Sequence, residues 1–141
     1  MNPPEDLKGL NLNDISIVLK LDYHGTGVLL TGDVEKISEN RIRQTYGDSL
    51  KSDILKVAHH GSETSTQTAF LEYVQPRVAI ISVGKNNIYG HPSPSVMTSL
   101  KEHGIITFRT DLDGAIDIEI TKRGFVVTAQ KSGRIFRGKR Q

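Results

Sequence analysis

Two apolar stretches of this chain end on side chains that can bind a metal ion. The stretch before position 33 ends at Asp33, and the stretch before position 59 ends at His59 and His60. A strand buried between helices holds its last residue rigidly, and the loops beyond such strands are where chemistry collects in layered α/β folds. Asp33 together with one of the histidines would suit a hydrolytic zinc or manganese ion.

Each of these side chains also has a second interpretation. A carboxylate such as Asp33 can bridge two cations about 3.5–4 Å apart, but an Asp at a junction between a strand and a helix can equally cap the helix that follows. His59 and His60 are adjacent, so in an extended backbone their side chains would diverge. One would then be a ligand and the other a neighbour of the ligand or of the substrate.

Further polar residues follow these two stretches. Ser62, Thr64 and Ser65 precede an expected helix, where they would bind phosphate oxygens together with the helix N-terminus or simply cap the helix. His91 lies in a loop after the most apolar segment and would either bind a phosphate and protonate a leaving group or fix the loop. Lys85 in the same loop would steer a polyanion or remain a solvated loop residue.

Hydrophobic periodicity predicts a regular succession of strands and helices. Strands are expected over residues 15–23, 28–30, 53–58, 78–83, 105–109, 115–121 and 125–130. Helices are expected over 34–46, over 68–74 with a cap at Ser65 or Thr66, and from Ser93 or Ser95 to His103. This order predicts an α/β (α+β) domain with a mixed sheet and helices on at least one face.

Composition limits the class of protein. A chain of 141 residues with 36% hydrophobic and 24% charged residues fits one globular domain with a real core. The absence of cysteine excludes a disulfide framework, a thiolate metal site and a cysteine nucleophile. No signal peptide is evident at the N-terminus, and no apolar run approaches about 18 residues. We therefore expect a soluble, cytoplasmic segment, or a soluble piece cut from a membrane protein.

The net charge of +2 is small, but basic residues gather at the end of the chain. Five of the last eleven residues are basic and none is acidic, namely Lys131, Arg134, Arg137, Lys139 and Arg140. Such a segment would attract phosphate backbones in a salt-dependent way, or it is a solvated terminus. We expect a flexible basic tail over residues 131–141.

Six short motifs together resemble a known family. In chain order they are Asn2-Pro3-Pro4, Asn13 followed by Ser16–Leu19, Leu30–Asp33, Leu55–Ser62, Ser82–Gly84 leading to Tyr89–Pro92, and Thr110–Asp111 with Asp113–Gly114. This series resembles the second half of the metallo-β-lactamase-like domain of the DNA-uptake competence protein ComEC and its soluble relatives. The resemblance covers residues 2 to about 120 and assigns residues 1–130 to that half-domain.

The resemblance implies half of a four-layer αβ/βα sandwich with a two-metal site in the cleft between its halves. In that family the first half supplies a His-x-His/Asp-x-Asp-His cluster, which has no counterpart before Asp33 here. The second half supplies a bridging Asp and a further His, which match Asp33 and His60. His59 and His91 then become the candidate catalytic side chains, with Ser62, Thr64, Ser65 and Lys85 as candidate substrate contacts.

The implied activity is metal-dependent hydrolysis of a phosphodiester, in DNA during uptake, by a nuclease site that is incomplete in this chain. The cofactor would be zinc or manganese, as a pair when the site is complete, and the isolated chain is expected to be inactive. The expected partners are DNA or another phosphodiester and the missing N-terminal half or a second copy, without membrane contact by this segment. The alternatives are a hydrolase of small phosphodiesters or esters and a non-catalytic half-domain.

Overall fold

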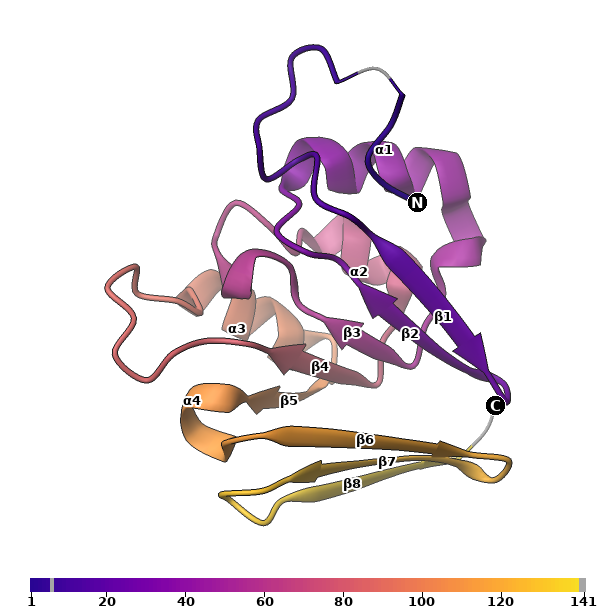
Figure 1. Cartoon of the computed structure of the whole chain (residues 1–141), viewed down its shortest axis with the longest axis vertical. Coiled ribbons are helices and arrows are strands. Elements are labelled where there is room, and N and C mark those ends of the chain that lie inside the picture. The colour runs from indigo at the N-terminus through magenta and orange to yellow at the C-terminus, as the bar shows by residue number, and fades with distance from the viewer. Residues whose placement is uncertain (6, 140–141) are drawn as a thin grey trace.

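The protein, described here from a computed structural model that covers residues 1–5 and 7–139, contains two sheets and a layer of helices (Figure 1). The larger sheet has the strand order β1-β2-β3-β4-β5, with β1 at Leu19–Tyr23, β2 at Thr26–Leu30, β3 at Ile54–Lys56, β4 at Val78–Ile81 and β5 at Ile106–Arg109. β1 pairs antiparallel with β2, and the other strands pair in parallel. The predicted mixed sheet is confirmed.

Three helices cover one face of this sheet, namely α1 (Lys36–Tyr46), α2 (Thr68–Val74) and α3 (Pro94–Glu102). Alternate strand residues such as Leu29, Leu55 and Ala79 point toward the helices and are buried against side chains such as Phe70 and Leu100. This alternation follows from the period of two along a strand. The predicted α/β class with helices on one face is therefore confirmed. No helix within the described residues is long and apolar enough to cross a membrane.

The second sheet covers part of the opposite face. A short helix α4 (Thr110–Asp113) leads into the antiparallel strands β6 (Ile116–Thr121), β7 (Gly124–Ala129) and β8 (Ile135–Lys139). Val28, Ile54 and Val78 of the large sheet form a second core with Phe125 and Val127 of β7. The larger sheet is thus sandwiched between the helices and β6–β8 (Figure 1).

The sequence did not predict β8. It falls in the segment expected as a flexible basic tail, yet Ile135–Lys139 pairs with β7 along its length. Phe136 packs against Phe125 with ring centroids 5.9 Å apart. The strand was missed because its apolar residues are few among basic ones, and pairing with β7 rather than local pattern makes it a strand. Arg140 lies outside the described residues.

Several element boundaries differ from the prediction by a few residues. β1 begins at Leu19 rather than at residue 15, since a backbone bond of 2.9 Å from Ser16 N to Asn13 O makes a turn there. α1 begins at Lys36 rather than at residue 34. Asp33 therefore does not cap α1.

The N-terminus of α1 is capped by a residue from a distant loop. The Oδ1 atom of Asp14 accepts hydrogen bonds of 3.1 Å from the backbone N–H groups of Glu35 and Ser38. The start of α3, by contrast, follows the local prediction, because the hydroxyl of Ser93 accepts a bond from Val96 N.

The start of α2 is likewise held by a distant carboxylate. Glu39, in the first turn of α1, accepts bonds of 2.5 Å from Thr66 N and 2.9 Å from Gln67 N. The predicted cap by Ser65 or Thr66 is wrong, because no side chain next to the helix bonds its first N–H groups. Glu39 is only 1% exposed. Burial raises the pKa of Glu39 to about 7, with the charge of Asp14 adding to the effect and the backbone bonds opposing it.

The raised pKa of Glu39 predicts a pH-dependent stability. Between pH 4.5 and about 7 the folded chain retains a proton that the unfolded chain releases, so the free energy of unfolding should fall as the pH rises. We expect a fall of roughly 2–3 kcal/mol across this window, measured by urea unfolding at several pH values. Glu39→Gln should remove this fall of the free energy of unfolding with pH. Glu72→Gln, on the exposed side of α2, should keep it. An unchanged slope in the Glu39 variant would contradict the assignment.

Candidate functional site

The candidate site forms where three parallel strands end together. The ladders pair Leu30 with Lys56 and Lys56 with Ile80, so β2, β3 and β4 stop at the same edge of the sheet. The loops beyond this edge carry Asp33, the two histidines and His91, and parallel pairing brings such loops into one place.

The two histidines lie on a tight turn rather than on the expected extended backbone. Residues 58–61 form a single 3₁₀ turn in which both His59 (φ 46°) and His60 (φ 55°) are left-handed, a conformation uncommon outside glycine. The turn is held by the bonds His59 N to Gly32 O of 3.1 Å and Ser62 N to His59 O of 2.8 Å. The two side chains diverge as predicted, but toward different carboxylates.

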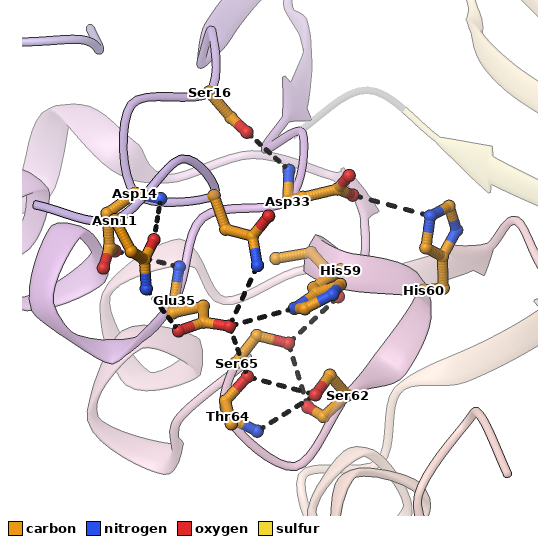
Figure 2. A network of polar contacts seen from close by, with 12 residues as sticks. Asn11, Asp14, Ser16, Asp33, Glu35, His59, His60, Ser62, Thr64 and Ser65 are labelled. Atoms are coloured by element: carbon orange, nitrogen blue, oxygen red, sulfur yellow. Dashed lines mark hydrogen bonds and ion pairs between the residues drawn. The ribbon is translucent and has the colours of Figure 1, made fainter. Parts of the chain in front are cut away.

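Asp33 and His60 converge at the surface. Oδ1 of Asp33 lies 3.6 Å from Nε2 of His60, and the two side chains are 41% and 47% exposed (Figure 2). The structure thus brings together the Asp and the His that the resemblance matched to metal-binding residues. His59 instead faces Glu35, with Nδ1 at 3.2 Å from Oε1.

The arrangement of His60 fits a metal ligand. Its Nδ1 lies 2.6 Å from the carbonyl oxygen of Ser82. A carbonyl can only accept, so Nδ1 carries the hydrogen and the lone pair of Nε2 faces Asp33. A carboxylate oxygen and an imidazole lone pair directed at each other are suitable donors for a divalent cation. Among the described residues, no group of three or more His, Cys, Asp or Glu side chains lies within reach of one ion.

The loop that carries Asp33 is fixed by a residue whose role the sequence left open. The hydroxyl of Ser16 accepts a bond of 3.2 Å from Asp33 N. Gly32 has φ +55°, and a Cβ on it would lie 2.8 Å from Ser16 Cβ, so this close approach requires glycine. Asn13, the other residue left open, donates to Glu35 at 3.2 Å.

His91 lies beside the two histidines on the loop after β4. Its ring centroid is 5.8 Å from that of His59. The loop is fixed by Asn87, which bonds both the N and the O of His91 at 2.9 Å. Burial, followed by the nearby His59 and His60, lowers the pKa of His91.

A hollow of about 400 Å³ opens beside this loop. It is lined by His60, Ser82, Val83, Gly84, Asn87, Tyr89 and His91. Lys85 is exposed and is not part of this lining.

The geometry does not support a phosphate site at the start of α2. The N–H groups of Thr66 and Gln67 already donate to Glu39. Ser65 is 1% exposed, and its hydroxyl donates to Ala58 O and Ser62 O, both at 3.0 Å. Ser65 therefore builds the histidine loop. The Thr64 hydroxyl bonds Ser62 and Glu35, each at 3.0 Å.

Two site residues were not predicted, namely Glu35 and Lys56. Burial lowers the pKa of Lys56, and the charge of Asp33 opposes this effect. Its Nζ donates to Val57 O at 2.9 Å. A lysine at the end of an otherwise apolar strand was the sequence signal for Lys56. Glu35 offered no comparable signal, because its partners come from distant loops.

The chain is similar in sequence to segments of several longer proteins. The chain is 41% identical over 120 residues to ComE operon protein 3 of Bacillus subtilis (strain 168), covering 85% of this chain and 15% of that protein. It is 38% identical over 128 residues to competence protein ComA of Neisseria gonorrhoeae, covering 91% of this chain and 18% of that protein. This chain is homologous to one segment of competence proteins.

A third relative is also similar over part of its length. Recombination protein 2 of Haemophilus influenzae is 40% identical over 106 residues, covering 75% of this chain and 13% of that protein. No protein-family model matches the chain. This chain therefore spans less than a fifth of the length of each of these relatives. The predicted relation to competence proteins is confirmed, whereas the metallo-β-lactamase assignment stays a prediction.

The packing of Gly61 should be needed to hold the two histidine loops of the competence segment together. Gly61 has φ +83°, and a Cβ on it would lie 2.6 Å from Pro92 Cβ. Gly61→Ala should therefore lower the free energy of unfolding by roughly 2–4 kcal/mol, measured by urea denaturation. Gly84→Ala is the matched control, because a Cβ there meets nothing within 4 Å. Equal stability of the two variants would contradict this packing.

Proposed function

We propose that this competence segment is the second half of a metal-dependent nuclease domain of the metallo-β-lactamase type that acts on DNA during uptake. The observation that carries the proposal is the open pair of Asp33 Oδ1 and His60 Nε2, 3.6 Å apart at the end of parallel strands. The name of the Neisseria gonorrhoeae relative, a competence protein, supports DNA as the substrate.

In this proposal Asp33 and His60 would hold the metal ions together with ligands from another polypeptide segment. When bound, zinc or manganese would supply an activated water and neutralise charge on the phosphoryl oxygens. The carbonyl of Ser82 orients the His60 ring for this task. Burial and the neighbouring His59 and His60 lower the pKa of His91, which is placed to exchange a proton with a substrate oxygen.

An exposed apolar face supports the need for a partner. Leu19 and Leu21 of β1 and Leu30 of β2 are 55%, 54% and 42% exposed, beside exposed Ile17 and Tyr23. Their paired neighbour Val28 on the same face is covered by the second sheet. A contiguous apolar patch of this kind marks an interaction surface. We propose that the missing first half of the domain, or a second copy of the chain, covers it.

A second candidate function is hydrolysis of a small phosphodiester or ester. The hollow of about 400 Å³ beside His60 and His91 has the size of a small-molecule site. A non-catalytic half-domain is the third candidate, and the presence of only two converging metal donors among the described residues favours it. Binding of single-stranded DNA that weakens steeply with salt would separate the nuclease from both alternatives.

Metal binding by the 141-residue chain should be weak and should depend on the converging pair. Calorimetric titration with Mn²⁺ or Zn²⁺ should show weak binding that is lost in Asp33→Ala and in His60→Ala. His103→Ala is the matched control, because this exposed histidine on the far end of α3 bonds Ser99 O. Binding that survives the loss of His60 but not of His103 would reject the site.

Nuclease activity should require the complementary half. The chain alone should not cleave single-stranded DNA in the presence of Mn²⁺. The segment that precedes the matched region in the Bacillus subtilis relative, added or fused in front of the chain, should restore metal-dependent cleavage, and His60→Ala should abolish it. Robust cleavage by the chain alone would contradict the proposal that its metal site is incomplete. Hydrolysis of only a small phosphodiester by the fusion would favour the second candidate.

A further inference from the structure

Glu35 occupies the position of a helix cap but does not act as one. It is the residue before α1, with an extended backbone (φ −110°, ψ −176°), and its side chain makes no capping bond. The capping acceptor is Asp14, which receives the N–H groups of Glu35 and Ser38. The carboxylate of Glu35 is therefore available for another task.

Three donors from two loops hold this carboxylate in place. Asn11 donates to Oε2 at 2.9 Å, and Asn13 and Thr64 donate to Oε1 at 3.2 and 3.0 Å (Figure 2). All three bonds are donated to the carboxylate, which accepts them through both of its oxygens. An ionised carboxylate only accepts hydrogen bonds.

The same oxygen faces the buried nitrogen of His59. Nδ1 of His59 lies 3.2 Å from Oε1 of Glu35. This contact does not meet the geometry of a full hydrogen bond, and Nδ1 is buried with no other partner among the described residues. Oε1 is thus the acceptor within reach of Nδ1. It is identified by the Nδ1–Oε1 distance of 3.2 Å and not by the angle of a hydrogen bond. The only arrangement that satisfies both groups puts the hydrogen on Nδ1.

The His59 ring lies near the two other imidazoles of the site. Its centroid is 6.4 Å from that of His60 and 5.8 Å from that of His91. The backbone of His59 is left-handed, and its N–H donates to Gly32 O. Nδ1 and Nε2 lie on different edges of an imidazole, so a ring tied at Nδ1 presents Nε2 away from Glu35.

We propose that Glu35 is a positioning residue that holds His59 in its Nδ1–H tautomer and leaves its Nε2 lone pair free. His60 has the same tautomer imposed by a different acceptor, the carbonyl of Ser82 at 2.6 Å. The turn thus presents two unprotonated Nε2 atoms, each tied at Nδ1. Only the use of the His59 lone pair, to accept a proton or to contact substrate, rests on the proposed function.

The tautomer is measurable without any metal or substrate. Long-range ¹H–¹⁵N correlation spectra of the ¹⁵N-labelled full chain at mildly alkaline pH separate protonated from unprotonated ring nitrogens. His59 should show a protonated Nδ1 and an unprotonated Nε2, the reverse of the tautomer that free histidine prefers in water. Signals are assigned by His59→Gln and His60→Gln variants.

Variants at position 35 test the cause. Glu35→Ala leaves no acceptor opposite Nδ1 of His59, so His59 should change to the Nε2–H tautomer. Glu35→Asp keeps the charge and should restore the Nδ1–H pattern at least in part. His60 should keep its pattern in both variants, which shows that the turn is still folded.

Two results would overturn the proposal. One is an Nε2–H pattern for His59 in the unaltered chain. The other is an unchanged His59 pattern in Glu35→Ala with the His60 signals intact. The spectra are recorded without metal or DNA, so they test the tautomer of His59 even if the chain has no part in a nuclease. Conversely, a different tautomer of His59 would not contradict the Asp33–His60 pair.

Discussion

The site depends on the parallel pairing of β2, β3 and β4. Their ladders align Leu30, Lys56 and Ile80, so all three strands end at one edge. Residues that are far apart in sequence are then forced into one set of neighbouring loops, and Asp33 and His60 approach to 3.6 Å. The helices on one face and β6–β8 on the other bury the strands, which makes these ends rigid enough to hold a geometry.

Three acidic side chains connect the loops around this edge. Asp14 binds the start of α1, Glu39 binds the start of α2, and Glu35 faces His59. Two of them lie on or next to α1, which therefore anchors both the histidine turn and the following helix. The burial of Glu39, with its pKa raised to about 7, shows that this connection has an electrostatic cost.

Local patterns predicted the features that depend on neighbouring residues. The apolar runs that stop at Asp33 and His59 predicted the strand ends. The serines at the start of α3 predicted a cap at Ser93 or Ser95, and Ser93 provides it. Features that depend on distant partners were not predicted. The caps of α1 and α2 come from Asp14 and Glu39, and β8 exists because it pairs with β7.

The sequence by itself determined which side chains can do chemistry and that they stand at the ends of apolar strands. From the residues alone, either His59 or His60 could be the ligand, and only the resemblance favoured His60. The tertiary structure separates the two by placing Ser82 O and Asp33 against His60 and Glu35 against His59. The reason is physical: the direction of each ring is set by a left-handed turn and by acceptors from distant segments, and neither is encoded in the local alternation of apolar and polar residues.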